Sequence, residues 1–437
     1  MRDPRGSSSM TLALFCKVID NFGDIGICWR LARQLYAEHG VAVCLLVDDL
    51  VSFQRIAPQV RPDQSMQQVD GVSVRHWHGT PVAGELGEIA DIVVEFFGCD
   101  IPETYIAEMA NCARTPVWLN LEGLTAEKWV EGCHFLPSPH PRFSLTKWFY
   151  FPGFNTSTGG LIRESQLIAR CASFQETPMQ RGEFLQSLGV TVVEAAALTI
   201  SLFCYPNAPV RQWFAALAGG AHPVTCLVPE GVAANDVEAF LGRTPVPGAV
   251  CTAGALTVRV VPFLPQPDYD RLLWACDLNV VRGEDSFVRA QWAGRPFIWH
   301  IYPQDQQLHH KKLKAFLDIH APGPAVVRAM LLWNDAVAGG DAAGDAGAAS
   351  GSTGEGKADY KAPFSVKGET KAEATADDVT GGTSVWPAVW RDLHADLPAM
   401  TKRAVAWRAA LLAQDDLATQ LLRFAEARQA EQQQKQV

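Results

Sequence analysis

Hydrophobic residues in the first half of the chain fall into short runs that polar or glycine-containing segments separate. The runs occupy residues 11–16, 41–49, 72–77, 92–97 and 117–122. Runs of this length, rich in Val, Ile and Leu, are typical of strands that are buried on both faces. We therefore predict a strand at each run.

Helical periodicity fills two of the segments between these runs. Residues 25–40 place Ile27, Leu31 and Leu35 on one helical face, and residues 102–110 also read as a helix. Strands that alternate with helices predict a parallel sheet with helices on both faces.

The second half repeats this order. Predicted strands lie at residues 198–205, 224–229, 256–264, 277–281 and 296–300, with a helix at 210–220. Two doubly wound units, joined around residues 155–195, predict an α/β protein with two Rossmann-like lobes. The carboxyl ends of the strands in each lobe would face a cleft between them.

The remaining segments complete the predicted domain plan. Residues 1–10 are polar with no apolar stretch behind them, so we expect a disordered leader and not a signal peptide. Residues 336–384 are rich in Gly, Ala and Asp and predict a flexible insertion. The plan is an N-terminal lobe at 11–180, a C-terminal lobe at 195–335, and closing helices at 385–430.

Composition narrows the class of protein. Of 437 residues, 48% are hydrophobic and 19% charged, which is a globular balance. A net charge of −10 argues against a nucleic-acid partner, and no apolar run reaches the length of a membrane span. The eleven cysteines form no CxxC pair. Scattered in apolar runs, they predict buried thiols in a reducing cytoplasm.

The segment from 276 to 300 carries the first candidate site. A strand ends at Arg282 and Gly283, and Glu284, Asp285 and Ser286 open a helix. The free N–H groups of a helix start favour an anion such as a diphosphate, while Glu284 could accept sugar hydroxyls. Asp285 and Ser286 are N-cap residue types, so an ordinary capped helix remains the alternative. The segment resembles the nucleotide-sugar site of GT-B glycosyltransferases.

Aromatic and amide side chains follow two other predicted strands of this lobe. Phe203 and Tyr205 lie at the end of one strand, and Phe263 and Gln266 follow another. Aromatic rings there could stack on a pyrimidine, and a glutamine could read its amide edge. Core packing is the alternative for each ring.

The turn after the first strand is acidic. Gly23 and Gly26 resemble a dinucleotide-binding turn only loosely, because Asp20 and Asp24 flank it and would repel a phosphate. The turn suits a cation instead. The alternative is that Asp24 is only a helix cap.

Two further motifs resemble metal sites without supporting one. Asp268 and Asp270 form a D-x-D that opens a predicted helix, where capping explains them better. His309 and His310 are adjacent on a predicted helix and point apart. We predict no metal and no cofactor.

These motifs, in this order and spacing, resemble the EarP family. The residues that carry the resemblance are the run at 19–35, the run at 147–164, Phe203 with Tyr205, and the run from 261 through 304. EarP proteins are protein-arginine rhamnosyltransferases that modify bacterial elongation factor P. The resemblance implies a GT-B fold, dTDP-β-L-rhamnose as donor, one arginine of elongation factor P as acceptor, and an inverting, metal-independent reaction.

The resemblance also implies roles for individual residues. Asp20 and Asp24 would be the essential carboxylates of the N-terminal lobe, and Glu284 that of the C-terminal lobe. The donor contacts would be Phe203, Tyr205, Phe263, Gln266, Arg282, Asp285, Ser286 and Tyr302. We expect a monomer with no nucleic-acid or membrane partner.

Arginine chemistry gives the paired aspartates a role. Its pKa of about 12.5–13.8 makes neutral guanidine scarce at pH 7, so a nucleophilic arginine needs a proton acceptor and an anionic field. We predict that Asp20 orients the guanidinium and that Asp24 takes the proton. Alternatives are a GT-B transferase with a small-molecule or lipopolysaccharide acceptor, a sugar-binding protein without catalysis, and a sugar-nucleotide epimerase.

Overall fold

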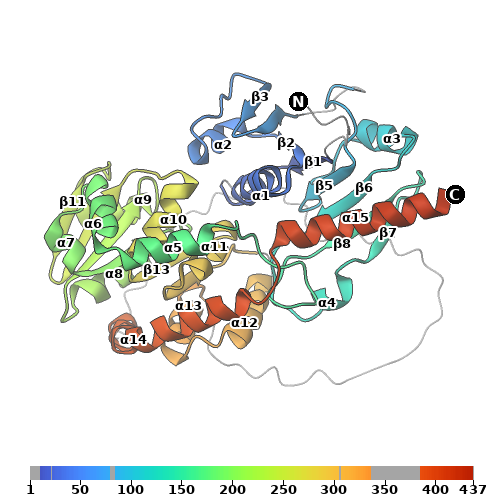
Figure 1. The fold of residues 1–437 in the computed structure, drawn as a ribbon. Coiled ribbons are helices and arrows are strands. Elements are labelled where there is room, and N and C mark those ends of the chain that lie inside the picture. The colour runs from blue at the N-terminus through green and yellow to red at the C-terminus, as the bar shows by residue number, and fades with distance from the viewer. Residues whose placement is uncertain (1–9, 21, 79–83, 305–306, 336–383, 437) are drawn as a thin grey trace.

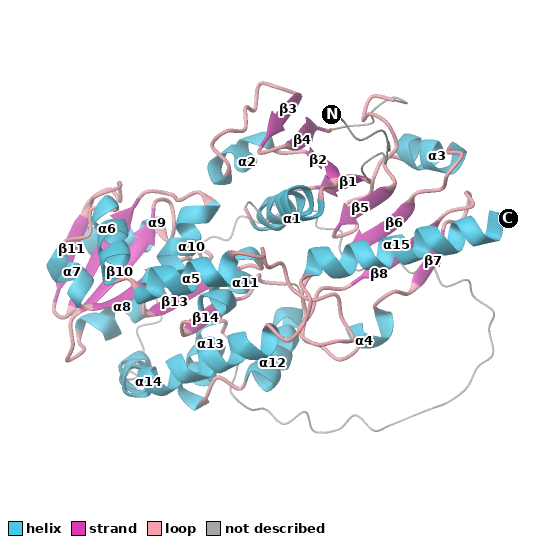
Figure 2. Ribbon diagram, viewed as in Figure 1, coloured by secondary structure: helices cyan, strands magenta, loops and turns pink. Residues whose placement is uncertain are grey.

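The computed structural model describes residues 10–20, 22–78, 84–304, 307–335 and 384–436. Two α/β lobes, each built on its own sheet, make up this part of the chain (Figures 1 and 2). The predicted α/β architecture with two parallel-dominated sheets is confirmed. The predicted leader and insertion fall, but for Met10 and Ser384, outside the described residues.

The N-terminal sheet has eight strands in the order β3-β4-β2-β1-β5-β6-β8-β7. The strands are β1 (Thr11–Cys16), β2 (Ala42–Val47), β3 (Met66–Val69), β4 (Val72–His76), β5 (Ile92–Phe96), β6 (Val117–Leu121), β7 (Pro137–Pro139) and β8 (Thr146–Tyr150). The five predicted strands are β1, β2, β4, β5 and β6, which pair in parallel. The edge strands β3 and β7 are antiparallel to their neighbours and were not predicted.

Helices cover this sheet on both faces, because the connections between its parallel strands run through helices. They are α1 (Gly23–His39), α2 (Leu50–Ile56), α3 (Glu103–Asn111) and α4 (Val130–Cys133). The predicted apolar stripe of α1 is buried: Ile27 is 6% exposed, and Leu31 and Leu35 are fully buried. Gly40 ends the helix in the left-handed conformation, with φ 67°.

The C-terminal sheet has six strands in the order β11-β12-β10-β9-β13-β14. The strands are β9 (Leu198–Leu202), β10 (Val224–Pro229), β11 (Val250–Ala253), β12 (Leu256–Val261), β13 (Leu278–Arg282) and β14 (Phe297–His300). The helices are α7 (Val192–Ala196), α8 (Val210–Ala218), α9 (Ala234–Leu241), α10 (Gln266–Ala275), α11 (Asp285–Ala293), α12 (Leu308–His320) and α13 (Pro324–Trp333).

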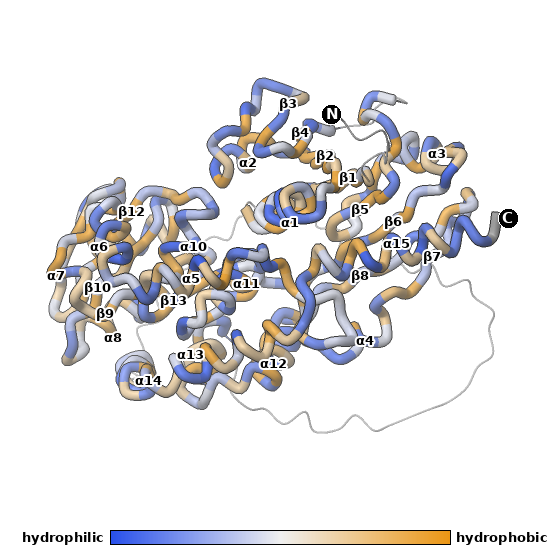
Figure 3. Tube along the Cα trace, in the orientation of Figure 1, coloured by the Kyte–Doolittle hydropathy of each residue, from blue (hydrophilic) through white to orange (hydrophobic). Residues whose placement is uncertain are grey.

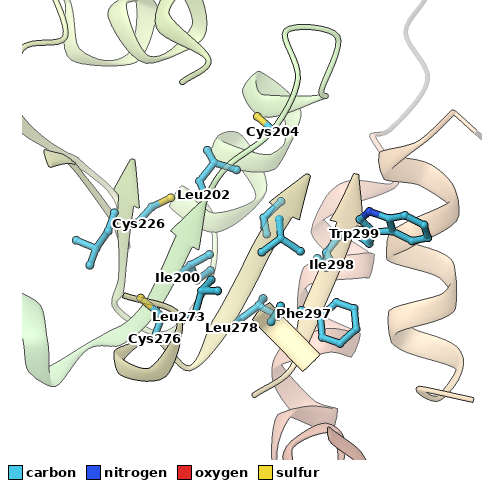
Figure 4. Close-up of a cluster of buried hydrophobic side chains, with 14 of the residues drawn as sticks. Ile200, Leu202, Cys204, Cys226, Leu273, Cys276, Leu278, Phe297, Ile298 and Trp299 are labelled. Carbon is cyan, nitrogen blue, oxygen red and sulfur yellow. The ribbon is translucent and has the colours of Figure 1, made fainter. Parts of the chain in front are cut away.

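The core of this lobe lies between the sheet and its helices. Ile200, Leu278 and Ile298 project from adjacent strands, and Cys226 and Cys276 pack among them as small apolar groups (Figure 4). All eleven cysteines of the chain are free, and seven are buried. The seven buried cysteines therefore act as packing residues, as their place in apolar runs predicts.

Two segments belong to a different lobe from their neighbours in sequence. Helices α5 (Leu167–Glu176) and α6 (Pro178–Ser187) pack on α10 of the C-terminal lobe, so the chain changes lobe before the predicted boundary at residue 180. Helix α14 (Trp386–Leu411) also packs on the C-terminal lobe. Helix α15 (Leu417–Gln436) returns to the N-terminal lobe and lies against α1 and β6 (Figure 1).

Hydropathy along the chain follows this arrangement. The central strands of both lobes are mostly hydrophobic, whereas hydrophobic and hydrophilic residues alternate along the helices (Figure 3). Within the described residues, no helix has both the length and the apolar character to cross a bilayer.

Candidate functional site

Two strand-to-helix turns meet between the lobes. One joins β1 to α1 in the N-terminal lobe, and the other joins β13 to α11 in the C-terminal lobe. The two helices pack against each other (Figure 1). Both turns lie at the carboxyl ends of parallel strands, where α/β proteins bind their ligands.

A cavity that is partly open to solvent lies at this meeting point. Most of the predicted site residues line it: Asp20, Phe203, Phe263, Gln266, Arg282, Glu284, Asp285 and Ser286. The other three predicted residues lie directly behind this lining. Asp24 and Tyr205 each form a hydrogen bond with Asp20. The ring of Tyr302 packs against that of Tyr205, with 5.5 Å between the ring centroids. The structure therefore brings all the predicted residues together.

Asp24 folds back onto the turn that precedes its helix. Its Oδ2 accepts hydrogen bonds from the backbone N–H groups of Ile19 at 2.7 Å and Asp20 at 2.8 Å. The N-cap position belongs to Phe22, so Asp24 is not the helix cap that the alternative reading supposed. Burial raises the pKa of the Asp24 carboxyl, and these two hydrogen bonds partly offset the rise. Its Oδ1 makes no hydrogen bond to the described residues.

Asp20 is held by the opposite lobe. Its Oδ1 accepts from Nη1 of Arg282 at 2.9 Å, and its Oδ2 accepts from the hydroxyl of Tyr205 at 2.7 Å. Burial raises the pKa of Asp20, and Arg282 and Tyr205 work against that rise. His300 in turn accepts from the backbone N–H of Tyr205, and burial lowers the pKa of this histidine to about 3.

Glu284 is the third carboxylate of the site. Burial raises its pKa to about 7, although its Oε2 accepts a hydrogen bond from the backbone N–H of Leu124 at 3.0 Å. Leu124 belongs to the loop after β6, so this bond joins the two lobes. A carboxyl group with a pKa near neutrality changes charge within the physiological range.

The turn before α11 requires glycine. Gly283 has φ 60°, and a Cβ there would lie 2.9 Å from Oδ2 of Asp20 and 3.0 Å from the hydroxyl of Tyr205. Helix α11 begins after Glu284, and Ser286 does not cap it: its hydroxyl accepts from the backbone N–H of Arg282 and donates to the carbonyl of the same residue. The N-cap role considered for Asp285 and Ser286 is therefore wrong. The first-turn N–H groups of α11 have no acceptor within the helix.

The predicted donor residues contact the N-terminal lobe as well as the cavity. Nε2 of Gln266 donates to the carbonyl of Gly26 at 2.8 Å. The ring centroid of Phe263 lies 4.9 Å from that of Phe22. The guanidinium carbon of Arg55 lies 4.9 Å from the ring centroid of Phe263. These contacts place both donor residues at the seam between the lobes.

A buried ionic cluster spans the same seam. Asp270 receives two hydrogen bonds from Arg30 of α1, at 3.0 and 3.1 Å, and two from Arg289 of α11, at 2.6 and 3.0 Å. Nε of Arg30 also binds Asp285 at 2.7 Å. Glu164 joins the cluster through Arg289; although burial raises its pKa, Arg289 and Arg30 lower it to about 2.

This cluster corrects the interpretation of the D-x-D motif. Asp270 is not a cap, since two arginines hold it. Asp268 lies in the first turn of α10 and pairs with Arg271 at 3.1 Å. His309 bonds to the backbone of Gln304, and His310 bonds to the carbonyl of Asn334. In the described part of the chain, no group of three or more His, Cys, Asp or Glu side chains is arranged to hold a metal.

The arginines of the cluster, Arg30 and Arg289, were not predicted as site residues. Arg30 and Gln34 fall at the third and seventh positions after Ile27, inside the stripe that predicted the buried face of α1. Both are 2% exposed. A charged residue in a buried helical stripe requires a partner, so this pattern was the available signal.

Comparison with known proteins places the chain in a family. The sequence profile described as Elongation-Factor P (EF-P) rhamnosyltransferase EarP matches residues 12–426. A protein-arginine rhamnosyltransferase of Pseudomonas putida is 52% identical over 310 residues, or 70% of this chain and 80% of that protein. A protein-arginine rhamnosyltransferase of Pseudomonas aeruginosa is 48% identical over 337 residues, or 76% of this chain and 88% of that protein.

A solved structure agrees with the sequence matches. It is described as the structural basis for EarP-mediated arginine glycosylation of translation elongation factor EF-P. The match has a TM-score of 0.60 at 33% identity and covers 95% of this chain and 99% of that one. The two facing Rossmann-like lobes are those of a GT-B glycosyltransferase. The chain is thus a glycosyltransferase and belongs to the EarP family.

Proposed function

We propose that the chain transfers L-rhamnose from dTDP-β-L-rhamnose to one arginine side chain of elongation factor P, with inversion at the anomeric carbon. The observation that carries this proposal is the acidic turn at Asp20 and Asp24, set opposite the start of α11. A cationic acceptor and an anionic donor would each find a complementary surface within one cavity.

The donor would lie on the C-terminal lobe. Its diphosphate would accept hydrogen bonds from the first-turn N–H groups of α11 and from Arg282, which stabilise the charge that grows as the sugar leaves. Phe203 and Phe263 would hold the thymine, with Gln266 at its amide edge. Tyr302, 39% exposed beside Tyr205, would contact the same ligand.

The acceptor guanidinium would lie on the N-terminal lobe. Neutralising an arginine at pH 7 costs about 8 kcal/mol, at 1.36 kcal/mol for each of some six pKa units. The two carboxylates attract the cationic side chain, and one of them takes its proton as the nitrogen bonds to the sugar, so a free neutral guanidine does not have to form first. Asp20 would orient the guanidinium, and Glu284 would hold the sugar or help to orient the acceptor.

Asp24 is the better candidate for the base. Oδ2 of Asp24 is committed to two backbone donors, whereas its Oδ1 has no partner among the described residues. Its pKa is raised by burial, which makes it a stronger proton acceptor than an exposed aspartate. A direct attack by the guanidinium nitrogen on the anomeric carbon, with dTDP leaving from the opposite face, gives inversion in one step.

The proposal places the reaction in the cytoplasm, with the enzyme as a monomer. Eleven free cysteines fit a reducing compartment. No metal or cofactor enters the proposed steps.

Mass spectrometry tests the proposal. Purified elongation factor P is incubated with the chain and dTDP-rhamnose, and fragmentation locates any added mass. We expect a gain of one deoxyhexose on an arginine, and with Asp24→Asn a gain that is about 10²–10⁴-fold slower. Unmodified elongation factor P, with rhamnose transferred to a small molecule or lipopolysaccharide instead, would contradict it.

A further inference from the structure

Each oxygen of the Asp20 carboxylate already accepts a hydrogen bond from the C-terminal lobe. Arg282 occupies one oxygen and the hydroxyl of Tyr205 occupies the other, at 2.9 and 2.7 Å. The side chain of Asp20 is 15% exposed and that of Arg282 is 9% exposed. An incoming guanidinium would therefore meet a carboxylate whose two oxygens both have partners.

Arg282 binds Asp20 as a substrate arginine would. Its guanidinium donates to the carboxylate and lies 4.8 Å from the ring centroid of Phe203 and 4.5 Å from that of Tyr205. Guanidinium–carboxylate bonds and contacts with aromatic rings are what a site for an arginine side chain offers. The enzyme thus supplies from its own chain the type of group that its acceptor must bring.

We propose that Arg282 keeps the acceptor's place on Asp20 until the donor binds, and that the diphosphate of the donor then draws Arg282 away. This inference rests on the proposed function and adds an order to it: the donor binds first, and the acceptor arginine then gains Asp20.

Electrostatics gives the direction of the exchange. A diphosphate brings two anionic groups to the start of α11, three residues after Arg282, and arginine binds phosphate through two parallel hydrogen bonds. One carboxylate competes poorly with two phosphates for a single guanidinium. Without the diphosphate, the guanidinium groups of Arg282 and of the acceptor would compete for Asp20 and repel each other. Acceptor binding would therefore be weaker.

The exchange predicts a coupling between two ligands. Elongation factor P is titrated into the enzyme by calorimetry, with and without saturating dTDP, which carries the diphosphate but no sugar to transfer. We expect dTDP to tighten acceptor binding by about 5–150-fold, the range typical of coupled sites. Linkage requires the acceptor to tighten dTDP binding by the same factor.

Two matched variants isolate the guanidinium. Elongation factor P with the modified arginine replaced by alanine should bind with an affinity that dTDP does not change. Enzyme Arg282→Met should bind the normal acceptor tightly without dTDP, and added dTDP should change that affinity by less than about twofold. Arg328→Met, which breaks an exposed pair with Asp392, should keep the full response.

Three results would overturn the inference: a wild-type acceptor affinity that dTDP leaves unchanged, an Arg282→Met enzyme that still needs dTDP, or no measurable acceptor binding in any form while transfer proceeds. If Arg282→Met does not fold, Arg282→Lys serves, and its single ammonium group should reduce the response without removing it. A transfer assay on the same preparations separates the two claims. Transfer without coupling defeats only the order of binding, whereas the absence of transfer defeats the proposed function.

Discussion

The turn that leads into α1 and the turn that leads into α11 both join a buried parallel strand to a helix through glycine. Their side chains differ. The first carries Asp20 and Asp24, whereas the second carries Arg282 with Glu284 and Asp285. The first therefore repels a phosphate, and the second presents a cation and helix N–H groups to one.

The same strand–turn–helix backbone therefore presents two surfaces of different charge character. In the first turn, the carboxylate of Asp24 accepts hydrogen bonds from the backbone N–H groups of Ile19 and Asp20. These N–H groups are therefore not available to an anion. In the second turn the nearby carboxylates bind partners in the N-terminal lobe, Asp285 to Arg30 and Glu284 to Leu124. The start of α11 remains for a ligand, and the two turns are fixed face to face.

The largest effect should come from the first turn. Asp24→Asn keeps an oxygen for the N–H groups of Ile19 and Asp20 but cannot accept a proton. We expect transfer to fall by about 10²–10⁴-fold, the usual contribution of a general base, with dTDP affinity retained. Steady-state transfer and a dTDP titration measure the two quantities. Asp268→Asn is the control and should be fully active. Near-normal turnover by both Asp24→Asn and Asp20→Asn would show that the turns do not divide the work as described.

The contact between the turns should show the next largest effect. Arg30→Met leaves the buried Asp270 and the half-buried Asp285 with fewer partners. Loss of one partner from a buried pair typically costs about 3–5 kcal/mol of unfolding free energy. A shift of α1 against α11 by about 1 Å can lower kcat by up to about 10²-fold. Thermal melting and kcat are measured together with dTDP affinity, which should change less than kcat.

The control for Arg30 is an arginine in an exposed pair. Arg211→Met breaks a contact with Asp236 in which the arginine is 69% exposed, and it should cost no more than about 1 kcal/mol. If Arg30→Met melts like wild type and keeps its kcat, the cluster does not set the geometry between the turns.

The local character of both turns was predictable from sequence, and so were the central strands. Runs of buried apolar residues specify β1 and β13 without reference to the rest of the chain. The edge strands β3 and β11 were missed because they are four residues long and partly exposed, so neither shows a hydrophobic run. Their structure depends on pairing with β4 and β12.

The connections between the turns were not predictable. Arg30 and Asp270 are 240 residues apart, and Tyr205 and Asp20 are 185 apart. No local pattern tells which arginine will meet which carboxylate once two lobes dock. The sequence predicted that Asp20 faces a cation; it could not show that one such cation is Arg282 of the same chain.

The donor side of the comparison is tested by Phe263→Ala. If the ring stacks on thymine, dTDP binding should weaken about 5–100-fold, corresponding to roughly 1–3 kcal/mol for a stacked base. A core residue would behave differently, with about 3–5 kcal/mol lost from stability. A melting curve and a dTDP titration on the same variant separate the two roles. A large drop in melting temperature with normal dTDP binding would assign Phe263 to packing against Phe22 and Arg55.

The protonation state of Glu284 should affect how kcat/KM depends on pH. Burial raises its pKa to about 7, so the group is protonated below that pH and anionic above it. If the anion holds the substrates, kcat/KM should rise about tenfold per pH unit below 7 and level off above it. Glu284→Gln should lower activity and remove this step. A profile with the same step in the variant would assign it to Asp20 or Asp24, whose pKa values burial also raises.

The smallest effect should follow removal of divalent metal. Asp270 is held by two arginines and Asp268 pairs with Arg271, so the D-x-D carboxylates have partners other than a cation. The start of α11 and Arg282 can meet the charge of the diphosphate in its place. Transfer should therefore be unchanged after treatment with EDTA, and Asp268→Ala should match wild type with or without added Mg²⁺. Activity that EDTA abolishes and Mg²⁺ or Mn²⁺ restores would mean that the second turn needs a metal to hold its anion, and the contrast between the two turns would then rest on that ion as well as on their side chains.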